Sequence, residues 1–65
     1  MNRNLQISYE DYETCVIAQV TRLAEGEGIA DAGPWAQRVV LASEPIVRES
    51  YDNGVSVDAL AQAML

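Results

Sequence analysis

The side chains that could perform chemistry in this 65-residue chain are few. There is no histidine, the residue that most often serves as a general acid or base. The lone cysteine, Cys15, falls in the middle of an expected helix, with no basic residue within one turn to activate its thiol. We therefore interpret Cys15 as a small buried or half-buried apolar residue, and we predict that the protein is not an enzyme.

Carboxylates are the other candidate reactive groups. Glu10, Asp11 and Glu13 are neighbours on the convex surface of an expected helix, whereas the paired carboxylates of glycosidases flank a cleft. A second acidic group lies in the segment 25–31, but its spacing does not match a calcium-binding EF-hand loop. A single cysteine without histidine also excludes an internal disulfide and a zinc site of the cysteine–histidine type. We therefore predict no metal and no cofactor.

The charge balance indicates what kind of partner the chain could bind. Ten acidic residues stand against four basic ones, which gives a net charge of -6. This charge repels nucleic acids and anionic membranes, and it attracts basic proteins or the basic groove of a nucleic-acid enzyme. The alternative is that the acidity only keeps a small domain soluble. We expect a protein partner, with no direct nucleic-acid contact and no membrane contact.

Two stretches could make such a contact. The first, ISYEDYE at residues 7–13, combines three carboxylates with two tyrosines, which are amphipathic side chains suited to interfaces. The second is an arginine–leucine–arginine stripe on the otherwise polar side of a later helix. The candidate partner-binding residues are Tyr9, Glu10, Asp11, Tyr12, Glu13, Arg38, Leu41 and Arg48.

In size, acidity and lack of catalytic groups, the chain resembles the short proteins that phages and other mobile elements encode. Anti-CRISPR proteins and other anti-defence inhibitors are the best-known kind, and the resemblance is one of type, not of motif. It implies an inhibitor that occupies a basic surface of a nucleic-acid enzyme, in some cases by presenting carboxylates where phosphates would lie. Two alternatives stay open, namely a homo-oligomeric structural or regulatory adaptor and an oligomer that sequesters a small anionic ligand.

A second resemblance covers YDNGVSVDALAQAML, residues 51–65, which look like the opening half of a helix-turn-helix. In that family a recognition helix rich in polar and basic residues follows, and this sequence has no such segment. We therefore do not expect the chain to read DNA.

A first helix must position the residues of the first stretch. Ser8 is a suitable N-cap for a helix over about 9–24, and Gly26 is the expected C′ residue after it. Its apolar stripe comprises Tyr9, Tyr12, Val16, Ile17, Val20, Leu23 and Ala24. Glu13 also projects onto this stripe, so it either lies at a frayed end or, as we prefer, pairs with an arginine from elsewhere, because an unpaired buried carboxylate is costly.

A second helix should begin at Pro34, where the missing N–H of proline is no loss. Its apolar side chains keep one phase past Pro45, and they are Trp35, Val39, Val40, Ala42, Ile46, Val47 and Tyr51. We predict one kinked helix over about 34–52, in preference to the alternative in which Ser43 caps a new helix. The stripe is wide enough for two neighbours, which raises the hypothesis of a homodimer through this helix. The residues at the centre of that hypothetical contact are Val40, Val47 and Tyr51.

Ser56 should cap a short third helix over about 57–64, after Gly54 has ended the second. The elements together predict an all-α fold, a small three-helix bundle that forms a single domain over residues 1–65. Residues 1–7 are expected to form a flexible or extended arm. The sequence contains neither a recognisable signal peptide nor an apolar run long enough to span a bilayer, so we expect a cytoplasmic protein.

Overall fold

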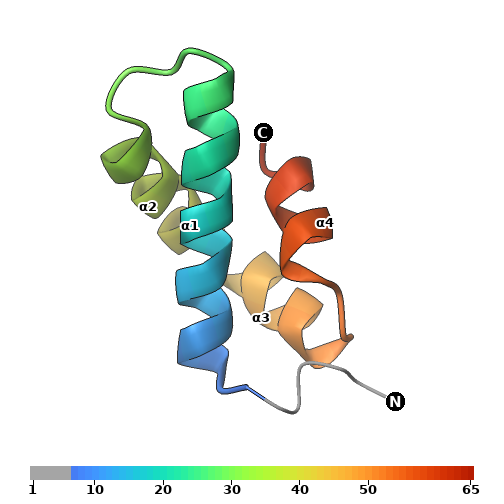
Figure 1. Cartoon of the computed structure of the whole chain (residues 1–65). Helices are drawn as coiled ribbons and strands as arrows, with labels where there is room; N and C mark the ends of the chain where they lie inside the picture. Colours follow the sequence, from blue (N-terminus) through green and yellow to red (C-terminus); the bar gives the residue numbers. More distant parts are fainter. Residues whose placement is uncertain (1–6) are drawn as a thin grey trace.

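The computed structural model describes residues 7–65, which form four α-helices joined by turns and contain no strand (Figure 1). The helices are α1 (Tyr9–Gly26), α2 (Ala32–Ala42), α3 (Glu44–Asp52) and α4 (Val57–Ala63). The predicted all-α fold is confirmed, and a small bundle is consistent with it, but the bundle has four helices rather than three. The arm predicted over residues 1–7 lies outside the described residues, except for Ile7.

The prediction of one continuous helix over 34–52 is wrong, because the chain breaks at Ser43 into α2 and α3, and α2 begins at Ala32 rather than at Pro34. Pro45 explains the break, since proline has no N–H to donate to the carbonyl of Leu41 and its ring clashes with that carbonyl. At Ser43 the backbone departs from helical geometry, with φ -104° and ψ 22°, and the Ile46 amide donates to the Ser43 carbonyl at 2.9 Å. The backbone therefore follows the alternative in which a new helix begins after Ser43, although the Ser43 side chain makes no capping bond.

The two predicted serine caps are confirmed. The Ser8 hydroxyl accepts a hydrogen bond from the Asp11 amide at 3.1 Å, and the Ser56 hydroxyl accepts one from the Ala59 amide at 3.1 Å. Each bond satisfies one of the free N–H groups in a first helical turn, which stabilises a helix by about 1 kcal/mol. These two bonds determine where α1 and α4 begin.

The end of α1 differs slightly from the prediction. Gly26 is the last helical residue, and Gly28 adopts the left-handed conformation at φ +80°. The Gly28 amide then donates to the Glu25 carbonyl and the Ile29 amide to the Ala24 carbonyl, both at 3.0 Å. This pair of bonds is the Schellman arrangement, in which Gly28 and not the predicted Gly26 is the C′ residue, and it ends α1 two residues beyond the predicted end.

The end of α3 uses the same arrangement at the predicted residue. Gly54 has φ +74°, and its amide donates to the Tyr51 carbonyl at 3.2 Å. The Val55 amide donates to the Ser50 carbonyl at 2.9 Å. The chain therefore turns sharply after α3 and enters α4 directly.

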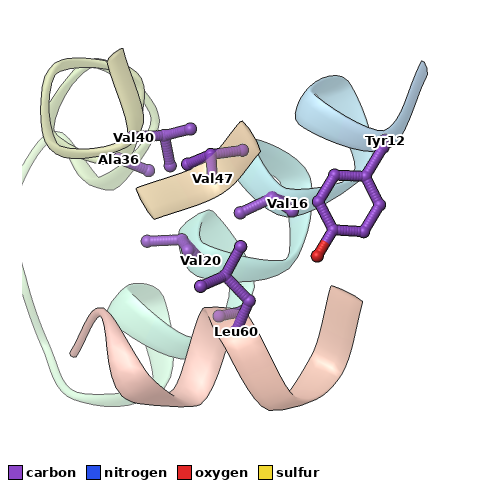
Figure 2. Close-up of a cluster of buried hydrophobic side chains, with 8 residues drawn as sticks. Tyr12, Val16, Val20, Ala36, Val40, Val47 and Leu60 are labelled. Atoms are coloured by element: carbon purple, nitrogen blue, oxygen red, sulfur yellow. The ribbon is translucent and has the colours of Figure 1, made fainter. Parts of the chain in front are cut away.

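The hydrophobic core lies between α1 and the other helices, and α1 packs mainly against α2 and α4 (Figure 2). The buried apolar residues are Tyr12, Val16, Val20, Ala24, Ala32, Ala36, Val40, Val47, Leu60 and Ala61. On α1 and on α2 they recur every fourth residue, so each helix contributes one ridge to the interface. Because most of these side chains are valine or alanine, little apolar area per residue is buried and the core is thin.

The buried positions also correct the hypothesis of a homodimer centred on Val40 and Val47. Both side chains are fully buried in the core of their own chain, so they offer no surface to a second copy. Tyr51 is half-buried and packs against the same core. A homodimer would have to use other residues of α2 and α3.

Candidate partner-binding surface

The N-terminal end of α1 meets α3 in a cluster of three tyrosines. Tyr51 of α3 contacts Tyr9 and Tyr12 of α1 edge-on, with ring centroids 5.5 Å and 5.3 Å apart. Such pairs contribute about 0.5–1.5 kcal/mol each beyond the area that they bury. The Tyr51 hydroxyl also donates to the Ile7 carbonyl at 2.6 Å. The tyrosine cluster therefore joins the start of α1, and the residue that precedes its cap, to α3.

Tyr12 is the buried member of this cluster. Its side chain has no exposed surface and belongs to the cluster of buried side chains in Figure 2. Its hydroxyl donates to the Val55 carbonyl at 2.9 Å, which connects α1 to the segment before α4. Burial raises the pKa of the Tyr12 hydroxyl. The inclusion of Tyr12 among the partner-binding residues is therefore corrected: Tyr12 belongs to the core, and it acts by holding the surface residues around it in place.

Tyr9 is half-buried, and its ring supports an arginine. The guanidinium carbon of Arg48, on α3, lies 4.1 Å from the centroid of the Tyr9 ring, a cation–π contact. Burial raises the pKa of the Tyr9 hydroxyl, and the negative charges of Glu13 and Glu44 raise it further. These contacts place residues from two helices, and from two of the predicted groups, on one surface.

Glu13 does not pair with an arginine of the described residues, which was the preferred expectation for it. The side chain is half-buried beside Tyr9, and its carboxylate accepts a hydrogen bond from the Tyr9 hydroxyl at 3.4 Å, which is long for such a bond. Because the carboxylate is only partly covered and keeps access to water, it does not need a buried counter-ion.

Glu10 and Asp11 lie in the first turn of α1, and both are exposed. The positive end of the helix dipole favours carboxylates there. Within residues 7–65 neither side chain forms an ion pair. Both charges therefore face water, in the helical turn that begins with Tyr9.

The break at Ser43 divides the predicted arginine–leucine–arginine stripe. Arg38 and Leu41 remain exposed on α2, where 49% of the Leu41 side chain is accessible. Arg48 lies on α3 and stacks on Tyr9. We therefore define the N-terminal surface as Tyr9, Glu10, Asp11, Glu13 and Arg48, and we treat Arg38 and Leu41 as a separate region.

Sequence reasoning missed two neighbours of the N-terminal surface, Glu44 and Tyr51. Glu44 precedes Arg48 by four residues, which is the spacing that puts two side chains on one helix face, so its position could have been inferred. Tyr51 was assigned to the apolar stripe without any indication that it would meet the tyrosines of α1. That contact depends on how the helices pack, which the local pattern does not reveal.

A second acidic region lies at the opposite end of α1. We call Glu25, Glu27 and Asp31 the loop cluster, and all three are exposed. Asp31 precedes α2 in the left-handed conformation, with φ 54° and ψ 46°, and its side chain makes no capping bond. Within residues 7–65 no ion pair or aromatic contact involves these residues. The loop cluster therefore has charge and the backbone hydrogen bonds that end α1, but within residues 7–65 it has no aromatic contact.

The remaining candidate features are a thiol, potential metal ligands, pockets and membrane-spanning helices. Cys15 is exposed, so the prediction that it is buried or half-buried is wrong. Within residues 7–65 no three His, Cys, Asp or Glu side chains are placed to hold a metal ion, and no pocket is present. In the same part of the chain, no helix has both the length and the apolar character needed to cross a membrane.

The N-terminal surface thus combines a half-buried aromatic ring, a stacked arginine and carboxylates held by a capped helix. This arrangement can recognise a surface of opposite charge, because an aromatic anchor beside charged groups is typical of protein interfaces. Comparison of the chain with protein-family models, with curated proteins and with solved structures found no match.

Proposed function

We propose that this protein is a small acidic protein-binding protein whose N-terminal surface contacts a basic surface of its partner. The observation that carries the proposal is that Glu10 and Asp11 are exposed without an ion pair in residues 7–65, in the helical turn that begins with Tyr9, whose ring contacts Arg48. A partner that supplies lysine or arginine would neutralise these carboxylates without breaking any bond within the described residues.

The ordered first turn of α1 should strengthen the binding of a partner. The Ser8 cap and the tyrosine cluster hold the first turn of α1 in place, so little conformational entropy is lost when a partner binds. The Tyr9 ring supplies apolar area that can exclude water from the charged contacts around it, and such exclusion strengthens them. Charge complementarity of this kind also raises the association rate at low salt.

The partner class that we propose is a nucleic-acid enzyme, because its basic groove is built to receive rows of negative charge. Carboxylates of the N-terminal surface would lie where phosphates lie in the enzyme's complex with its substrate. In this proposal the protein is an inhibitor of the type encoded by phages and other mobile elements, of which anti-CRISPR proteins are an example. The resemblance to such proteins in size, acidity and lack of catalytic groups supports this choice, as does the net charge of -6.

A competition experiment tests the proposal. The protein is added to a panel of nucleic-acid enzymes with basic grooves, RNA-guided nucleases among them, and displacement of a labelled duplex is measured by fluorescence anisotropy. We expect displacement from at least one enzyme at micromolar concentration, and a steep loss of affinity as salt rises from about 50 mM to about 500 mM. No displacement from any member of the panel, or an affinity that is flat with salt, would contradict the proposal.

The alternative of an anionic-ligand sequestrant finds less support. Its three described donors, Arg22, Arg38 and Arg48, lie on three different helices, and Arg48 already contacts Tyr9. No pocket exists within residues 7–65 of one chain. The sequestrant would therefore require an oligomer that assembles these arginines around the ligand.

A further inference from the structure

Arg48 is the only basic residue of the N-terminal surface, whose other charged members are carboxylates. Its guanidinium carbon lies 4.1 Å from the centroid of the Tyr9 ring, and the side chain as a whole is exposed. A uniformly basic partner would be repelled by a positive charge at this position. The carboxylates of the surface therefore do not explain why an arginine stands among them.

Pairing within the chain does not explain the arginine either. Glu44 precedes Arg48 by four residues on α3, a spacing at which helical ion pairs can form. The guanidinium contacts the ring of Tyr9 instead, and within residues 7–65 no ion pair or hydrogen bond involves Arg48. A cation–π contact uses the face of a ring and no hydrogen-bond acceptor, so the N–H donors of Arg48 remain available to a partner.

The contact with Tyr9 also restrains the arginine before a partner arrives. The Tyr9 ring packs edge-on against Tyr51, with the centroids 5.5 Å apart, so the support of the guanidinium belongs to the packed junction of α1 and α3. A side chain that is already restrained loses less conformational entropy on binding. The planar guanidinium presents its N–H groups as a fork that fits both oxygens of a carboxylate.

We infer that Arg48 donates hydrogen bonds to a carboxylate of the partner, so that the surface bound by this protein is basic around one acidic side chain. The inference rests on the proposed function, because it concerns the same partner and the same surface. The partner's basic residues contact Glu10, Asp11 and Glu13, and its carboxylate contacts Arg48. This pattern selects among basic surfaces, because one without the carboxylate would leave Arg48 desolvated and unpaired.

Two arginine-to-glutamine variants test the inference against the enzyme from which the unmodified protein displaces duplex. Arg48→Gln and Arg38→Gln remove the same charge from exposed positions, one inside the N-terminal surface and one outside it. Arg48→Gln should bind at least about tenfold more weakly, because the partner's carboxylate is left unpaired. Arg38→Gln is the matched control and should bind as tightly as the unmodified protein or slightly more tightly, because the chain becomes more negative. Circular dichroism verifies that the helices remain in both variants.

Two further variants separate a charge contact from mere support of the Tyr9 ring. Arg48→Met keeps a long side chain at this position without the charge and should bind as weakly as Arg48→Gln, whereas Arg48→Lys keeps the charge and should recover part of the affinity.

The possible outcomes distinguish this inference from the proposed function. Unchanged or tighter binding by Arg48→Gln, full affinity in Arg48→Met, no recovery in Arg48→Lys, or an equal loss in Arg38→Gln would overturn the inference and leave the proposed function standing. If the unmodified protein displaces duplex from no enzyme of the panel, the proposed function fails and the inference fails with it.

Discussion

The two ends of α1 carry three carboxylates each, yet they differ in what surrounds those carboxylates. At the N-terminal end a capped first turn packs on the tyrosine cluster, and Arg48 stacks on the Tyr9 ring. At the other end, the loop cluster lies around a left-handed Gly28 and a left-handed Asp31, without an aromatic contact in the described residues. Equal charge is therefore presented on a helical turn that packs against tyrosines at one end, and on the last residues of α1 and the turn that follows at the other.

Under the proposed function, net charge alone does not define the binding surface. A carboxylate on an ordered base keeps its position when a partner arrives, whereas one on a turn loses conformational freedom on binding. We therefore propose that the N-terminal surface recognises the partner and that the loop cluster contributes to solubility. The predictions below alter one end at a time.

The largest expected effect is on stability, at the base of the N-terminal surface. Tyr12→Ala removes a fully buried ring and its hydrogen bond to Val55, which should cost about 3–5 kcal/mol. This is comparable with the whole stability expected for a domain of this size, so circular dichroism should report a largely unfolded chain. Ile29→Ala, at a half-buried position of the loop, should leave the protein folded. Equal stabilities of the two variants would contradict the structural difference between the two ends of α1.

The next largest effect on stability is expected from loss of the Ser8 cap at the N-terminal end of α1. Ser8→Ala removes the acceptor of the Asp11 amide and should lower the free energy of unfolding by about 1 kcal/mol. Urea titration followed by Trp35 fluorescence measures the change. Ser56→Ala, which removes the same bond at α4, is the control and should cost a similar amount. A Ser8 variant as stable as the unmodified protein would mean that the cap does not hold the first turn.

At the loop cluster, one substitution should raise the stability of the protein rather than lower it. Asp31 has φ 54°, a conformation that costs an L-residue energy, and its side chain makes no capping bond. Asp31→Gly should therefore raise the free energy of unfolding by about 0.5 kcal/mol, and Asp31→Ala should lower it. Thermal melts of both variants decide the sign. Loss of stability in the glycine variant would show that the aspartate has a structural role that the loop cluster otherwise lacks.

Alkaline pH should affect the N-terminal end alone. Burial raises the pKa of Tyr12, and burial with the nearby carboxylates raises the pKa of Tyr9, so the folded state holds both phenol protons more tightly than the unfolded chain does. Their contribution to stability is complete below about pH 10 and is lost as pH rises further. The melting temperature should fall in that range, and the double variant Tyr9→Phe/Tyr12→Phe should show a smaller fall. An unchanged slope would contradict these pKa directions.

Local signals predicted the starts of α1 and α4 and the end of α3. Ser8, Ser56 and Gly54 each act through hydrogen bonds to residues a few positions away, so the sequence pattern is enough to recognise them. The break at Ser43 was not predicted, because the helical spacing of the apolar residues continues through Pro45 without an inserted residue. The same apolar spacing therefore fits one kinked helix and two separate helices. The lost hydrogen bond and the steric clash at Pro45 favour two helices.

Positions that depend on packing were predicted less well. Tyr9 and Tyr12 occupy the same stripe, but only Tyr12 is covered completely, and its hydroxyl partner Val55 lies 43 residues away. Ala32 and Ala36 are buried although neither was assigned to the core, since alanine occurs both inside and outside helical bundles. For the same reason the pattern did not reveal that Ile46 stays exposed while Val47 is buried.

The most direct test of recognition by the N-terminal surface is a paired binding measurement. Glu10→Gln/Asp11→Asn/Glu13→Gln and Glu25→Gln/Glu27→Gln/Asp31→Asn remove the same charge from opposite ends of α1, and each is titrated at one salt concentration against the enzyme from which the protein displaces duplex. We predict that the N-terminal variant binds at least about 30-fold more weakly than the unmodified protein, and that the loop variant stays within about threefold. Equal losses in the two variants, or a larger loss in the loop variant, would contradict the assignment.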